Sequence, residues 1–139
     1  MAIMYVTHNL GVVAQTCDEV AVMYLGRIVE RASIDDIFYN PKHPYTTSLL
    51  RSIPRLGRRH KERLEVIRGS LPDPYSQITG CPFHPRCPSV IPGLCDRVVP
   101  EITTVDGDPD HTVRCHLYPG STPAGAVEGQ STNAASASA

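Results

Sequence analysis

The cysteines of this chain are concentrated in one short segment that is also rich in proline. Only one of the five lies in the first half, and the other four follow the spacing C-x5-C-x7-C-x19-C: Cys17, then Cys81, Cys87, Cys95 and Cys115. Nearly half of the 13 prolines fall in the same stretch. Prolines forbid long regular elements, and few large apolar residues are present to build a core. This segment therefore needs a covalent or metal staple to hold one shape.

In an intracellular chain such a cluster indicates metal or redox chemistry before disulfides. Four thiolates complete a site for zinc or for an iron-sulfur cluster. Zinc ribbons usually pair their ligands on a C-x2-C or C-x4-C knuckle, which is missing here, whereas wide gaps suit the larger cluster. Arg86 beside Cys87, with His84 close by, favours the thiolate form and balances cluster charge. Spacing alone leaves cluster, zinc, and disulfides or free thiols open.

The remaining candidate ligands have simpler explanations. Cys17 recurs with Leu10, Val13 and Ala14 at helical spacing, which predicts a place in the core. Three histidines lie near the late cysteines, but four cysteines already complete a site, so we expect ordinary loop residues there: His84, His111 and His116.

Overall composition is that of a small soluble domain. The chain has 139 residues, of which 41% are hydrophobic and 19% charged. Its 13 basic and 14 acidic residues almost cancel, so no global field favours nucleic acid or an anionic membrane. No apolar run reaches the ~20 residues that span a bilayer, and the first residues lack the features of a signal peptide. We therefore expect a cytoplasmic protein, with residues 120–139 as a disordered tail.

Hydrophobic spacing and capping residues predict the elements of the first half. An apolar run predicts an interior strand, and the Thr7-His8-Asn9 sequence can cap the helix that follows. A Leu25-Gly26 turn joins two further strands into a hairpin, and Pro44 suits the first position of a helix. The predicted strands are 2–7, 20–24 and 27–31, and the predicted helices are 10–17, 34–39 and 44–52.

A basic stretch follows these elements. Residues 51–68 hold seven basic and two acidic residues, a net charge of +5. A solvated linker with a strand at 64–67 accounts for this stretch, because it lacks a helical stripe of basic residues. The rival reading is a zinc-stabilised module that binds nucleic acid through these residues.

His8 stands where the predicted strand 2–7 ends and a helix begins. The carboxyl edge of a sheet is where open α/β proteins place their ligands. A lone histidine there is more often a neighbour of a helix cap than a catalytic residue. Position alone does not decide between the two.

Three longer segments resemble a known family. The run MYVTHNLGVVAQTCDEVAVMYLGRIVE resembles the switch-histidine region of ABC transporter ATP-binding subunits. The continuation IFYNPKHPYTTSLLRSIP and the block GSLPDPYSQITGCPFHPRCP are similar to the oligopeptide/dipeptide importer branch. The resemblance covers about residues 2–118. It implies an α/β fold: the C-terminal fragment of a P-loop ATPase domain at 1–55, and an irregular, metal-binding extension at 56–119.

The same resemblance implies roles for particular residues. His8 matches the switch histidine, which contacts the γ-phosphate of ATP and positions the attacking water. Some family members hold a 4Fe-4S cluster on the late cysteines, which places a cluster ahead of zinc as the cofactor; the implied ligands are Cys81, Cys87, Cys95 and Cys115. The implied partners are a second ATP-binding subunit and membrane-spanning permease subunits, with ATP and Mg in the intact subunit.

Several motifs of an active ATPase are missing from the sequence. A P-loop needs G-x-x-x-x-G-K-[ST], and neither lysine, Lys42 or Lys61, is preceded by glycine. An LSGGQ-like signature and a Walker B strand are also missing. We therefore expect the C-terminal part of a peptide-importer subunit that is inactive alone, peripheral on the inner membrane face. The main alternative is a free-standing iron-sulfur or zinc module for electron transfer or partner binding.

Overall fold

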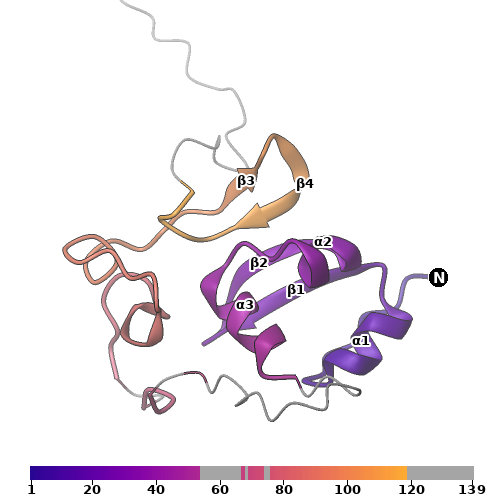
Figure 1. Ribbon diagram of the computed structural model, residues 1–139, viewed down its shortest axis with the longest axis horizontal. Helices are drawn as coiled ribbons and strands as arrows, with labels where there is room; N and C mark the ends of the chain where they lie inside the picture. The colour runs from indigo at the N-terminus through magenta and orange to yellow at the C-terminus, as the bar shows by residue number, and fades with distance from the viewer. Residues whose placement is uncertain (54–66, 68, 74–75, 119–139) are drawn as a thin grey trace, which may run out of the picture.

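The computed structural model describes residues 1–53, 67, 69–73 and 76–118. Figure 1 shows helices and strands in the first half, an irregular segment, and a second pair of strands near the end. The helices are α1 (Leu10–Thr16), α2 (Ile34–Tyr39) and α3 (Pro44–Arg51), with a 3-10 turn at His84–Arg86. The strands are β1 (Glu19–Tyr24), β2 (Arg27–Ser33), β3 (Thr103–Val105) and β4 (Asp108–Val113).

The strands form one antiparallel sheet in the order β1-β2-β4-β3. Two tight turns close its hairpins. Leu25 and Gly26 have φ values of 45° and 77°, and Asp106 and Gly107 have φ values of 52° and 77°. Consecutive positive φ values are typical of the turns whose twist matches that of paired strands. The sheet thus joins two hairpins that are far apart in the sequence.

Side-chain caps explain where the helices begin. The Asn9 side chain accepts hydrogen bonds from two amides of α1, and Ser33 accepts one from Asp36 in α2. In α3, Pro44 occupies the first turn, and the ring of His43 accepts a hydrogen bond from the Tyr45 amide. These helices and the β1–β2 hairpin confirm the predictions made from capping and turn residues.

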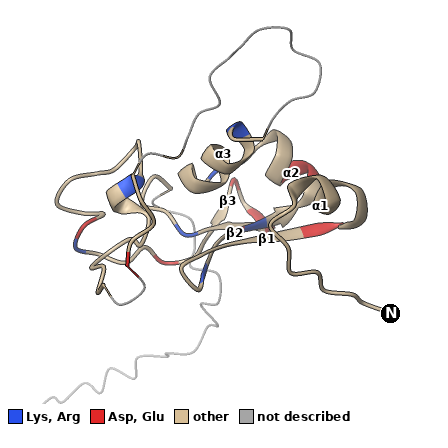
Figure 2. Cartoon of the chain, turned by 90° about the horizontal axis from the view of Figure 1, so that it is seen from below, with Lys and Arg blue, Asp and Glu red and all other residues tan. Residues whose placement is uncertain are grey.

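The helices α2 and α3 cover one face of the sheet (Figure 2). That face carries the buried side chains of Val22, Ala32 and Val113, and Ile37 of α2 is fully buried in one cluster with Val22 and Ala32. On the opposite face Ala21 and Met23 are exposed. The core therefore lies between the helices and this face of the sheet and extends to Cys81, Phe83 and Cys95 of the irregular segment.

A buried carboxylate ties the second hairpin to the first. Glu30 of β2 is 1% exposed, and its side chain accepts hydrogen bonds from the amides of Lys42 and His43 at 2.7 and 2.9 Å. The ring of His111 in β4 lies 2.9 Å from the same carboxylate. The Tyr118 hydroxyl donates to the carbonyl of Lys42 at 3.0 Å. The loop before α3 is thus held by residues on both sides of position 55, where the sequence predicts the boundary between the two parts of the chain.

Two predictions differ from the structure. Residues 2–7 form no strand, and residues 1–9 are all exposed. An interior parallel strand needs neighbouring strands, and the described part of the chain offers it none. The hairpin β3–β4 was not predicted, because the segment that contains it was expected to be irregular. The strand predicted at 64–67 and the tail at 120–139 lie almost wholly outside the described residues.

Among the described residues, no helix has both the length and the apolar character needed to cross a bilayer.

Candidate functional site

His8 lies at a bend directly before α1 and is exposed. Its neighbours fix the local backbone: the Thr7 hydroxyl accepts a hydrogen bond from the Asn9 amide, and Asn9 caps the helix. The expected sheet edge is not formed here, so the structure does not place His8 at the end of a strand. The structure does place the His8 imidazole just before the N-terminus of α1, as predicted, and in an accessible position.

The four late cysteines lie outside the helices and strands, and Cys81 and Cys95 belong to one buried cluster with Tyr24, the last residue of β1. The amide of Cys81 donates to the carbonyl of Cys95 at 2.8 Å, which joins two parts of the loop. Gly80, with φ of 72°, makes this approach possible, because a Cβ there would lie 2.3 Å from the Cys95 carbonyl oxygen. Both cysteines are 7% exposed and belong to the core cluster, against which Cys87 also packs.

Backbone groups near the cysteines act on the thiols. Those of Phe83 and His84 lower the pKa of Cys81, and those of Ser89 and Leu117 lower the pKa of Cys87 and Cys115, respectively, although burial outweighs these effects. The Ile91 amide lies 3.4 Å from the sulfur of Cys95. Amide donors stabilise the thiolate over the thiol. The loop therefore provides the hydrogen bonds that a metal-bound thiolate needs.

The four thiols also lie near enough to influence one another. Burial, with smaller contributions from the charges of Cys81, Cys87 and Cys95, raises the pKa of the Cys115 thiol to about 11. Burial likewise raises the pKa of Cys81 and of Cys87. Cys81 and Cys95 are buried and Cys87 and Cys115 are half-buried, so thiolates formed together at these positions would repel one another.

The structure does not support the prediction that this extension forms a metal centre. Within residues 1–53, 67, 69–73 and 76–118, no three histidine, cysteine or acidic side chains approach closely enough to hold a metal ion. The five cysteines are free thiols. Burial favours the neutral thiol, and neutral thiols have no electrostatic reason to converge on one point. The 4Fe-4S or zinc assignment and its ligand set stay predictions.

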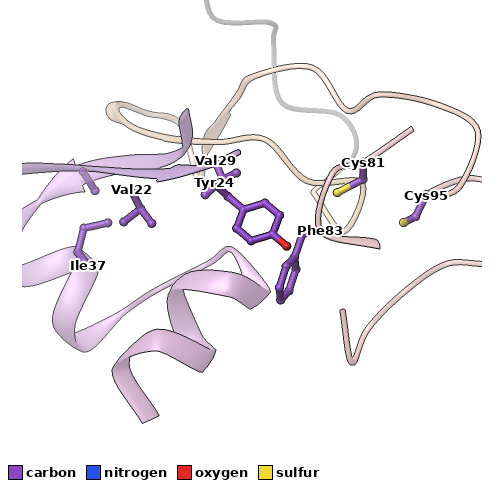
Figure 3. Close-up of a cluster of buried hydrophobic side chains, with 8 residues drawn as sticks. Val22, Tyr24, Val29, Ile37, Cys81, Phe83 and Cys95 are labelled. Atoms are coloured by element: carbon purple, nitrogen blue, oxygen red, sulfur yellow. The ribbon is translucent and has the colours of Figure 1, made fainter. Parts of the chain in front are cut away.

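An aromatic cluster separates the cysteines from the sheet, and sequence reasoning missed it. The Phe83 ring contacts Tyr24, Tyr45 and His43 at centroid distances of 5.3, 5.4 and 5.8 Å. Figure 3 shows Phe83 and Tyr24 between the sheet and the two buried cysteines. Phe83 is 1% exposed and anchors the cysteine loop to the first half of the chain. The only local sign of this anchoring role in the sequence is that Phe83 lies inside the C-P-F-H-P-R-C block.

The histidines near the cysteines have other partners. The His84 ring bonds to the Cys81 carbonyl at 2.9 Å, and the His116 ring bonds to the Val98 carbonyl at 2.8 Å. His111 is 3% exposed and pairs with Glu30, so it is a core residue rather than a loop residue. Cys17 follows α1 as its C-terminal cap and is only half-buried, so the expected core position is wrong.

Comparison with known proteins agrees with the resemblance stated above. Residues 29–95 match a family described as the oligopeptide/dipeptide transporter, C-terminal region. This match covers most of β2, all of α2 and α3, and the loop that carries Cys81, Cys87 and Cys95.

Curated relatives extend the similarity over most of the chain. This chain is 49% identical over 117 residues to the dipeptide transport ATP-binding protein DppD of Bacillus subtilis, and the alignment covers 84% of this chain and 34% of that protein. It is 45% identical over 114 residues to a probable peptide ABC transporter ATP-binding protein of Sinorhizobium fredii, covering 82% and 33%, respectively. The chain thus spans about a third of the length of the curated relatives it matches. None of this supports a free-standing iron-sulfur or zinc module.

Proposed function

Because this chain belongs to the family of peptide ABC transporter ATP-binding subunits, whose C-terminal region it matches, we propose that it acts as that part of a peptide importer. The intact subunit hydrolyses ATP with Mg at the cytoplasmic face of the membrane. It works with a second ATP-binding subunit and with permease subunits that span the membrane. The observation that carries this proposal is 44–49% identity over more than four fifths of the chain to proteins named for peptide transport.

His8 is the residue of this chain that acts on ATP in the proposal. Phosphoryl transfer depends on positioning and charge stabilisation, and an imidazole can orient the attacking water near the γ-phosphate. The Thr7 and Asn9 hydrogen bonds hold the backbone around His8, and its exposure leaves the ring accessible to a nucleotide bound by other parts of the subunit. No P-loop occurs in the sequence, so the chain alone has no phosphate cradle.

Two measurements test this assignment. The purified chain should show no ATP turnover. In a subunit that carries a P-loop together with this region, His8→Ala should abolish hydrolysis and leave nucleotide binding intact. Gln15→Ala, an exposed change on the neighbouring helix α1, is the matched control and should hydrolyse ATP normally. Loss of nucleotide binding in His8→Ala would show that His8 is structural.

We also propose that the four late cysteines hold a 4Fe-4S cluster, with zinc as the second choice. The chemistry of the donor set supports the proposal, because four thiols are the ligands that such a cluster takes, and the Ile91 amide already donates to the sulfur of Cys95. When bound, the group would replace four thiol protons and cross-link the loop. The ligands would be Cys81, Cys87, Cys95 and Cys115.

Metal analysis of anaerobically purified protein tests this second proposal. We expect about four iron and four sulfide per chain, as for a cubane on four thiolates. Serine at any of the four positions should lower the metal content and expose residues 80–116 to proteolysis. Cys17→Ser should leave it unchanged, since Cys17 caps α1 away from the loop. Stoichiometric zinc without iron would replace the cluster with a zinc site, and full stability without all four cysteines would exclude both.

A further inference from the structure

Residues 2–7, called the arm below, have the composition of a strand that is buried on both faces, yet they lie in solvent. The arm contains no charged residue, no proline and no glycine. Met4 and Val6 are 87% and 92% exposed, and Ile3 and Tyr5 are more than half exposed. Alternate side chains of an extended segment point to opposite faces, so both faces of the arm are apolar. The arm therefore lacks the neighbours that such a sequence needs.

Strand β1 has a similar composition and a free edge. Within the described part of the chain it pairs only with β2, at one end of the sheet. After its first residue, Glu19, it carries no charge and no proline, and Ala21 and Met23 are exposed on the face away from the helices. The register shift in this pair makes Val29 of β2 the extra residue, so β1 itself is not bulged. Charges, prolines and bulges are the usual protection of an edge strand, and this edge has little of it.

The connection within one chain does not bring the arm to this edge. Residues 8–18 join the two, and the seven residues of α1 span only ~10 Å, about half of the ~20 Å length of a six-residue strand such as β1. The helix is thus too short to return the chain along a parallel neighbour. Figure 2 shows the arm leading away from the sheet, and residues 1–9 are all exposed. A second copy of the chain offers the same free edge without this restriction.

We propose that two copies of this chain associate by exchanging arms, so that residues 2–7 of each lie along the free edge of β1 in the other. Two-fold symmetry makes the two contacts identical and leaves neither an arm nor an edge free. The arm would continue the backbone hydrogen bonding of the sheet, as in other cases of strand addition. One of its faces would meet Ala21 and Met23, and the other would meet Val20 and Val22 on the side of the helices. This self-association does not depend on the proposed function.

Lysine substitutions in the arm and in the edge test the pairing. The side chains of Met4 and Met23 are both exposed in the single chain, so Met4→Lys and Met23→Lys should leave its fold intact. Sedimentation equilibrium of the full chain should show a monomer–dimer equilibrium, with a dissociation constant at least about tenfold higher in each variant, because a charge would enter an apolar contact. Tyr39→Lys is the matched control. Tyr39 is 86% exposed on α2, outside the arm and β1, so this variant should dimerise like wild type.

A mixture of the two variants tests the exchange itself. The Met23→Lys chain keeps an intact arm, and the Met4→Lys chain keeps an intact edge, so a mixed dimer retains one of the two contacts. We expect the mixture to associate at concentrations at which each variant alone is monomeric. Hydrogen exchange should slow at residues 2–7 in every sample that dimerises and stay fast in dilute wild type. At such dilution both variants should unfold at the wild-type denaturant concentration.

Several outcomes would overturn the inference. Pairing of arm with arm would survive Met23→Lys, and pairing of β1 with β1 would survive Met4→Lys. A mixture that does not associate would exclude the exchange of arms. A wild-type chain that stays monomeric at every concentration would exclude the dimer. If residues 2–7 of that monomer became protected only on addition of the P-loop-carrying part of a subunit, the arm would belong to that partner instead.

Discussion

At the scale of single residues, Glu30 carries the largest concentration of polar contacts. Its carboxylate accepts from two backbone amides and lies 2.9 Å from the ring of His111. In Glu30→Gln an NH2 group replaces one carboxylate oxygen. This group must face either the His43 amide or the Lys42 amide, and both of these are donors. We expect a loss of about 3 kcal/mol in unfolding free energy, the scale of a broken buried pair. Denaturant titration measures it.

Glu19→Gln is the control for that experiment. Glu19 also bonds an oppositely charged residue, Arg31, but both side chains are half exposed. Exposed pairs contribute little, so the midpoint should barely move. Similar losses in the two variants would contradict the importance of the buried network.

His43 gives the fold a dependence on pH. Burial lowers the pKa of its ring from 6.5 to about 4, while Glu30 and the Arg114 backbone raise it less. Between these two pH values the unfolded chain binds a proton that the folded chain does not. Stability is therefore complete above pH 6.5 and falls as pH drops toward 4, by about 3 kcal/mol in total.

The variant His43→Asn tests this pH dependence. Asparagine keeps a side-chain oxygen to accept from the Tyr45 amide but has no titrating group. Unfolding free energies measured at several pH values should show a flatter profile in the variant between pH 4 and 6.5. A wild-type slope retained in the variant would assign the titration to another residue.

At the scale of elements, Gly80 controls how the cysteine loop closes. An alanine Cβ would meet backbone atoms of Cys95 and Asp96 at 2.3 and 2.7 Å, and backbone cannot move aside cheaply. We expect Gly80→Ala to cost more than 2 kcal/mol, beyond the roughly 1 kcal/mol of left-handed backbone strain. Gly93→Ala isolates that strain, because Gly93 has φ of 80° and nothing within 4 Å of its Cβ position. Thermal unfolding of both variants should separate the two terms, and equal losses would argue against the close approach.

Local signals predicted the elements whose stabilising contacts are local. Caps at Asn9 and Ser33, the proline that opens α3 and the Leu25-Gly26 turn each act within a few residues. The Asp106-Gly107 turn is an equally strong hairpin signal. The strand after it, β4, was not predicted because Pro109 and the acidic residues beside it disfavour strand structure. That strand is held by its pairing with β2.

The candidate site was predictable to a similar extent. Spacing and composition identified the four late cysteines as one unit; the structure buries Cys81 and Cys95 in one core cluster, and the prediction of a shared site stays a prediction. The roles of Tyr24 and Phe83 were not visible in the sequence, because each depends on contacts between segments far apart. The metal itself is still a prediction. The strand at 2–7 failed because an apolar run specifies a strand only where neighbouring strands exist.

At the scale of the whole molecule, the first residues form an exposed apolar segment. Met1, Met4 and Val6 are almost fully exposed, and Ile3 and Tyr5 are more than half exposed. Because these side chains are not buried, deletion of residues 1–6 should leave the unfolding midpoint unchanged while reducing self-association. Sedimentation at increasing concentration measures the second effect. A control deletion that also removes Asn9 should destabilise α1, because it removes the cap. A lower midpoint in the shorter deletion would show that the segment contributes to the fold.

The pairing of Glu30 with His111 also sets an order of events during synthesis. The two residues are 81 positions apart, so a ribosome adding about 5–20 residues per second makes the histidine roughly 4–16 s after the carboxylate. In that interval the β1–β2 hairpin exists without β4, and Glu30 is hydrated instead of enclosed. The nascent chain therefore keeps one edge of β2 unpaired during this interval, and the sheet is completed only after β4 has been translated.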